Sequence, residues 1–186
     1  MTVDFWKEEY LLAPDFEDIY NYIVTHQNHS FFFSHCLEVE YGCDFFYQMC
    51  ICGDIKYKEY VDCEENLNRV FAELLKKEQF VAFAADRTIF NSRKAKKLTG
   101  LDKSQLNQLW DFCGKRQNII SSADAKNLLL CVTRGLASTC ALAINWRVLI
   151  LMQDLHGTIV LSEDTDRDVI GQMIKIFEKN NFVVIR

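Results

Sequence analysis

The feature that most constrains the fold is a change in the spacing of hydrophobic residues along the chain. Between residues 15 and 27 they recur every three or four positions, as in an amphipathic helix. Between residues 31 and 41 apolar residues occupy alternate positions, which predicts a strand with one buried face. The residues on these faces are Phe16, Ile19, Tyr20 and Ile23 for the helix, and Phe31, Phe33, His35, Leu37, Val39 and Tyr41 for the strand.

The rest of the chain follows the same two periods. Glycine-containing pairs at Gly53-Asp54 and His156-Gly157 predict two hairpin turns. The predicted strands are residues 31–41, 44–52, 55–61, 79–85, 140–153, 158–162 and 182–186, and the predicted helices are residues 15–27, 62–75, 92–98, 102–114, 121–133 and 165–179.

This order of elements predicts an α+β protein in which helices pack on a mixed or antiparallel sheet, formed as a single domain over residues 1–186. Residues 74–83 resemble residues 176–185, with three identical positions at an offset of 102. The alternative is therefore a pair of similar α-β-β-α-β halves, residues 1–86 and 121–186, joined by a basic helical segment at residues 87–120.

The chain contains eight cysteines and four histidines, and residues 29–52 hold four of the former and two of the latter. Structural zinc sites use closely spaced ligand pairs such as C-x2-C, and no C-x2-C pair occurs. We interpret the cysteines as small apolar core residues, and we expect no metal and no cofactor. A cysteine-dependent hydrolase or transferase stays open as an alternative, with Cys36 as the thiol and His26, His29 or His156 as the base.

Charge is distributed unevenly around a net value of −5. Residues 86–116 contain eight Lys or Arg and three Asp, a net +5, so the remaining residues sum to −10. A nucleic-acid-binding or regulatory role for the basic segment 87–116 is a second alternative. No glycine-rich phosphate-binding motif and no nucleic-acid-reading motif frames this segment, so nucleic acid is not the favoured partner.

Acidic residues concentrate in two stretches, residues 1–18 and residues 162–168, and the first of these is also rich in aromatic residues. At protein interfaces aromatic side chains supply burial energy, while carboxylates steer a charged partner. The pattern therefore indicates a surface that binds a basic protein. The candidate anchors and charge contacts are Trp6, Tyr10, Asp15, Glu17, Asp18, Glu163, Asp164 and Asp166.

In overall character the chain resembles the bacterial immunity proteins that neutralise polymorphic or contact-dependent growth inhibition toxins. Residues 6–10, 14–23 and 162–168 carry this resemblance. It implies a non-catalytic protein that binds a cognate toxin, often a nuclease, and occludes its active site. We therefore expect a basic toxin domain as the partner and no catalytic residues.

The N-terminal stretch is acidic and lacks the basic start and apolar run of a signal peptide. The longest apolar segment, residues 140–152, is interrupted by Asn145 and Arg147 and is too short to span a bilayer. We expect a cytoplasmic protein that makes no membrane contact and keeps its cysteines reduced.

Overall fold

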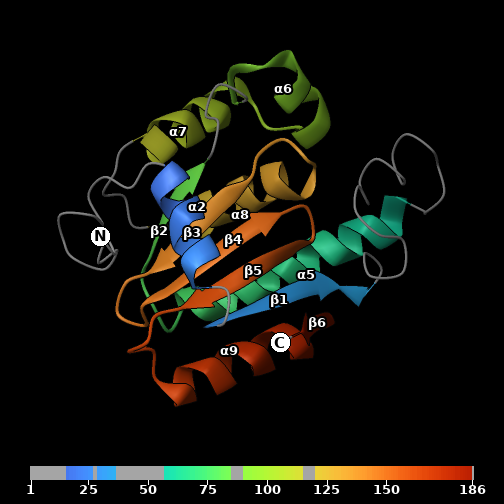
Figure 1. Cartoon of the computed structure of the whole chain (residues 1–186). Helices are drawn as coiled ribbons and strands as arrows, with labels where there is room; N and C mark the ends of the chain where they lie inside the picture. The colour runs from blue at the N-terminus through green and yellow to red at the C-terminus, as the bar shows by residue number, and fades with distance from the viewer. Residues whose placement is uncertain (1–15, 27–28, 37–56, 85–89, 115–119, 186) are drawn as a thin grey trace.

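The computed structural model describes residues 16–26, 29–36, 57–84, 90–114 and 120–185. Within these residues six strands form one sheet in the order β2-β3-β4-β5-β1-β6, and every neighbouring pair is antiparallel (Figure 1). The α+β class and the antiparallel sheet are thus confirmed. The strands are β1 (Ser30–His35), β2 (Phe80–Ala84), β3 (Thr139–Ala143), β4 (Val148–Gln153), β5 (His156–Leu161) and β6 (Phe182–Ile185).

The described helices cover the two faces of the sheet unequally. Helices α5, α8 and α9 pack on one face, and α6 and α7 form a second cluster with α8. Helix α2 packs on the opposite face. The helices are α2 (Phe16–Thr25), α5 (Tyr57–Leu75), α6 (Arg93–Thr99), α7 (Lys103–Gly114), α8 (Ser122–Thr133) and α9 (Arg167–Lys179).

The alternating residues of β1 point as the sequence predicts. Phe31 and Phe33 are buried in the main cluster between the sheet, α5 and α9. The ring centroid of Phe33 lies 4.5 Å from that of Phe177 in α9 and 6.0 Å from that of Phe182 in β6. Phe32, between them, points to the other face and is exposed. Predicted strand residues 37–41 and 44–52 lie outside the described residues.

The predicted strand at residues 55–61 is wrong over the part that the structure describes, because α5 begins at Tyr57. Residues 55–58 alternate between an aliphatic or aromatic side chain and lysine, which mimics a strand. Tyr60 nevertheless continues the helical stripe through Cys63 and Leu67, and all three are buried. The spacing of three and four over the longer segment therefore decides the local structure.

The predicted hairpin turn at His156-Gly157 is also wrong: the turn is formed by Asp154 and Leu155, and Gly157 lies inside β5. A Cβ atom at Gly157 would lie 2.6 Å from Cζ of Phe33. The glycine is therefore required for close packing and not for a turn. Residues 140–153, predicted as one strand, form β3 and β4 with a turn between them.

The carboxylate of Glu78 holds the turn between β3 and β4. It accepts hydrogen bonds from the side-chain amide of Asn145 at 2.8 Å, the backbone N–H of Trp146 at 3.0 Å and the backbone N–H of Gln79 at 2.5 Å. The Glu78 side chain is buried, so these donors replace its lost hydration. The hairpin is thereby attached to the connection between α5 and β2.

Strands from the two predicted halves interleave in the sheet, because β1 lies between β5 and β6. The two similar helix–strand segments, α5 with β2 and α9 with β6, contribute the two edge strands. The internal duplication itself stays a prediction.

Candidate functional site

Three of the predicted charge contacts lie together in the turn between β5 and α9, which we call the acidic turn (residues 162–166). Glu163, Asp164 and Asp166 are all exposed. Asp164 forms an ion pair with Arg147, and Asp166 caps α9 by accepting a hydrogen bond from the backbone N–H of Asp168 at 2.8 Å. Two of the three carboxylates thus also support the local structure, while all three face solvent.

The other five predicted contacts are not placed. Trp6, Tyr10 and Asp15 lie outside the described residues, and for Glu17 and Asp18 the structure describes only the backbone, in the first turn of α2. Their role in binding stays a prediction.

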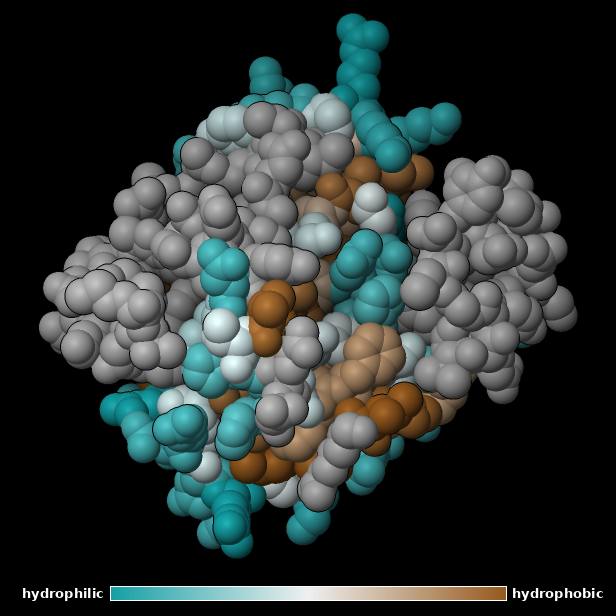
Figure 2. All heavy atoms as spheres, viewed as in Figure 1, coloured by the Kyte–Doolittle hydropathy of each residue, from teal (hydrophilic) through white to brown (hydrophobic). Residues whose placement is uncertain are grey.

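Three apolar side chains that the sequence did not single out form an exposed strip on β1 and β6. Phe32 is 39% exposed, Val183 39% and Ile185 48%, and we call them the β1–β6 strip. Phe32 lies directly opposite Ile185, and Val183 lies opposite Ser34 on the same face. This is the face on which α2 packs, but the α2 contacts lie on β2 to β5. Figure 2 shows apolar surface over the region where Figure 1 draws β1 and β6.

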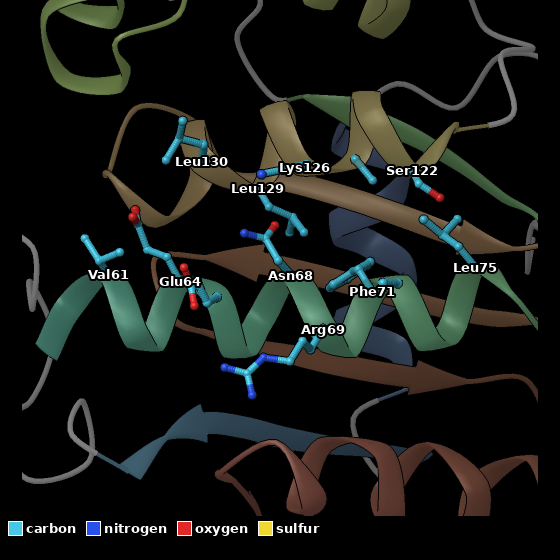
Figure 3. A pocket seen from close by; sticks show the side chains of 13 residues that line it. Val61, Glu64, Asn68, Arg69, Phe71, Leu75, Ser122, Lys126, Leu129 and Leu130 are labelled. Carbon is cyan, nitrogen blue, oxygen red and sulfur yellow. The ribbon is translucent and has the colours of Figure 1, made fainter. Parts of the chain in front are cut away.

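A groove of about 490 Å³ lies between α5 and α8 (Figure 3). Phe71, Leu75 and Leu129 contribute apolar walls, and Asn68 points from α5 toward α8. The side-chain oxygen of Asn68 is buried and accepts no hydrogen bond. The volume is typical of small-ligand pockets, which span roughly 300–1,000 Å³. Its charged lining, however, comprises two acids and two bases, so the groove favours no single ligand charge.

Glu64, which lines the groove, forms a buried ion pair with Arg134. Nε and Nη2 of Arg134 each donate to a different oxygen of Glu64 at 2.8 Å, and the Thr133 hydroxyl donates to Oε1 at 2.7 Å. Nη1 of Arg134 donates to the backbone carbonyl of Leu98 at 2.6 Å. The hydrogen bonds to Glu64 raise the pKa of Arg134. Both carboxylate oxygens of Glu64 are therefore occupied, which makes it a structural anion and not a general base.

The buried thiols are poor nucleophiles. Burial raises the pKa of Cys63 and of Cys131 to about 12, and it also raises the pKa of Cys140. Thiols with such pKa values are protonated near neutral pH, whereas the thiolate is the reactive species. These three cysteines lie in the apolar core, in keeping with their interpretation as small core residues. Cys36 is exposed, and its thiol donates to the backbone carbonyl of Asn181 at 3.1 Å.

His35 lies in the interior, where Nε2 is 3.2 Å from the side-chain amide nitrogen of Asn66 and its ring meets that of Phe182 edge-on. Burial lowers the pKa of His35 to about 4. A base with this pKa is neutral at physiological pH, so His35 can accept a hydrogen bond from Asn66.

The buried imidazole predicts a loss of stability in acid. The unfolded chain protonates His35 near its ordinary pKa of about 6.5, whereas the folded chain resists protonation down to about 4. Stability is therefore complete above the unfolded pKa and falls as the pH drops toward the folded pKa. We expect the free energy of unfolding to decrease by about 2 kcal/mol between about pH 7 and pH 5 through this residue.

Urea unfolding at several pH values measures this effect. His35→Gln should remove it, and the matched variant His29→Gln, at an exposed histidine, should retain it. An identical pH dependence in both variants would show that other groups cause the loss.

Comparisons with protein-family models, with characterised proteins and with solved structures found no match. Among the described residues, no three His, Cys, Asp or Glu side chains are grouped in a way that could hold a metal ion. None of the helices in the described ranges combines the length and the hydropathy needed to cross a bilayer.

Proposed function

We propose that this chain is a non-catalytic binding protein that neutralises a basic protein partner, in the manner of a toxin-immunity protein. The observation that carries the proposal is that the exposed β1–β6 strip lies on two strands beside β5, the strand that leads into the acidic turn. Interfaces commonly combine an apolar centre, which supplies burial energy, with a charged rim, which steers the partner.

The strand register gives the separation between the β1–β6 strip and the acidic turn. Phe32 pairs with Ile185 on one side and with Thr158 of β5 on the other. Ser162 follows Thr158 by four residues, about 13 Å at roughly 3.3 Å per residue. A typical interface buries about 800 Å² on each partner, which spans that distance. To contact the acidic turn, a partner seated on the strip must extend by about this distance to the end of β5, where the chain passes to the face that α9 covers.

The separation of charge supports a basic partner. Helix α6 carries Lys94, Lys96 and Lys97, all exposed. Figure 1 places α6 and the beginning of α9, where the acidic turn lies, on opposite sides of the molecule. The electric field of this charge distribution attracts a cationic partner to the side of the acidic turn and disfavours its approach from the side of α6.

The chemistry of the described residues also supports binding in place of catalysis. The buried thiols are protonated near neutral pH, and the carboxylate of Glu64 is fully engaged by Arg134 and Thr133. The finer assignment, to a toxin with a cationic substrate groove such as a nuclease, follows from the resemblance described above.

The test begins with the partner captured by the wild-type chain from the source organism and then purified. We expect the double variant Glu163→Lys/Asp164→Lys to bind it with an association rate at least about tenfold lower at low ionic strength. The difference should shrink as salt is added, because salt screens exposed charges. Production of the partner alone should inhibit growth, and co-production of the wild-type chain should restore it.

The matched control is Asp111→Lys/Glu178→Lys, which makes the same change in net charge at exposed positions of α7 and α9. It should associate much faster than the acidic-turn variant. In a second arm, Phe32→Ala should raise the dissociation rate about tenfold, while Val24→Ala at an exposed position of α2 should not. Equal kinetics for test and control variants, or a partner without effect on growth, would overturn the proposal.

A further inference from the structure

A separate cavity of about 200 Å³ lies between α6 and α7, on the side of the molecule away from the acidic turn. Arg93 and Lys96 line it from α6, and Lys103 and Asn107 line it from α7. The ring of Phe90, which is fully buried, forms part of its apolar lining.

The local sequence explains why three cations meet at this cavity. Ala95 is buried and fixes the rotation of α6, so Arg93 and Lys96, three residues apart, share one helix face. Lys94 and Lys97 do not line the cavity. Gly100, with φ of 72°, ends α6 in the left-handed conformation and reverses the chain. Helix α7 then begins at Lys103, which returns a third cation to the same space.

Among the described residues, no carboxylate lines this cavity. The nearest acid in sequence, Asp102, uses its side chain to cap α7 by accepting a hydrogen bond from the backbone N–H of Gln105 at 2.9 Å. Within the described residues, none of Arg93, Lys96 and Lys103 forms an ion pair. The three cations repel one another until an anion occupies the space between them.

Size and lining restrict the kind of anion. At about 200 Å³ the cavity has room for one or two phosphate groups. The buried ring of Phe90 has no free face on which a base could stack. Lysine, arginine and asparagine side chains all donate hydrogen bonds that phosphate oxygens accept.

We propose that the cavity between α6 and α7 is a phosphate-binding site, recognising phosphate as a free anion or as part of a larger ligand. Arg93, Lys96 and Lys103 neutralise the anion, and the amide of Asn107 donates a further hydrogen bond. The proposal uses different residues from the proposed protein interface and does not depend on it.

The test is calorimetric titration of the full chain with pyrophosphate at low ionic strength. We expect saturable binding that Lys96→Ala/Lys103→Ala weakens by at least about tenfold, because two of three charge-assisted contacts are lost. The matched control, Lys94→Ala/Lys97→Ala, removes the same charge from α6 outside the cavity and should weaken binding by less than about twofold. All four lysines are exposed, so both variants should fold, which thermal unfolding checks.

Two further titrants distinguish the source of the phosphate. A short single-stranded oligonucleotide with a 5′-phosphate and the same strand with a 5′-hydroxyl each compete with pyrophosphate. Competition by the phosphorylated strand alone supports recognition of a terminal phosphate, and equal competition by both supports recognition of backbone phosphates. Absence of saturable pyrophosphate binding, or equal weakening by the two double variants, overturns the proposal.

Discussion

Replacing Arg134 with alanine is expected to lower the free energy of unfolding by about 3–5 kcal/mol, because it leaves the buried carboxylate of Glu64 without its counter-ion. The same change removes the donor to the carbonyl of Leu98, and with it the link between α6 and the end of α8. The loss should be measurable as a lower midpoint of urea unfolding followed by circular dichroism.

Arg147→Ala is the matched control, because it breaks an ion pair with Asp164 in which both side chains are exposed. Its expected cost is at most about 1 kcal/mol. In the double variant Glu64→Leu/Arg134→Leu the charge and its partner disappear together, so part of the stability should return. Similar losses for Arg134→Ala and Arg147→Ala would show that the Glu64 ion pair behaves as a surface pair.

Replacing Gly157 with alanine is expected to cost about 3 kcal/mol, since the added methyl group has no room. Its Cβ would lie 2.6 Å and 2.8 Å from two ring carbons of Phe33 and in closer contact with the backbone carbonyl of Leu151. The backbone carbonyl cannot withdraw without disturbing the pairing of β4 and β5. Urea unfolding again measures the effect.

Gly171→Ala is the control for the loss of a glycine as such. Gly171 lies in α9, and a Cβ atom there meets nothing within 4 Å. Alanine should raise stability by about 0.5–1 kcal/mol at such a helical position. A near-neutral result for both glycines would contradict the packing described for Phe33.

Hydrophobic spacing predicted the elements whose buried face is regular. The alternation in β1 placed Phe31 and Phe33 in the core, and the helix predicted over residues 165–179 corresponds to α9. These assignments succeed because burial there follows from the local period alone.

The same reasoning failed where two local patterns compete, as at residues 57–61, or where a distant contact supports the local structure. Residues 57–61 join α5, and the hydroxyl of Tyr60 there donates to the carbonyl of Thr133, 73 residues away. Gly157 lies in a strand because Phe33 packs on it, although the glycine by itself suggests a turn. Neither Thr133 as the partner of Tyr60 nor Phe33 as the partner of Gly157 could be identified from the sequence around those residues.

The candidate sites also differ in whether the sequence alone predicts them. The acidic turn was predictable, because its charge is contiguous in sequence. The β1–β6 strip was not, since the exposure of Phe32 depends on which strand lies beside β1 and on where α2 packs. The cavity between α6 and α7 also required the structure, although its basic residues were noted in the sequence.

The position of β1 in the sheet has a consequence for biosynthesis. Both of its neighbours, β5 and β6, are translated more than 100 residues later, as the separations from Ser30 to His156 and from Ser30 to Phe182 show. A nascent chain that has emerged only as far as α8 therefore holds Phe31 and Phe33 without their strand partners. Until translation supplies them, these aromatic residues are a binding target for chaperones, and premature termination leaves them permanently open to proteolysis.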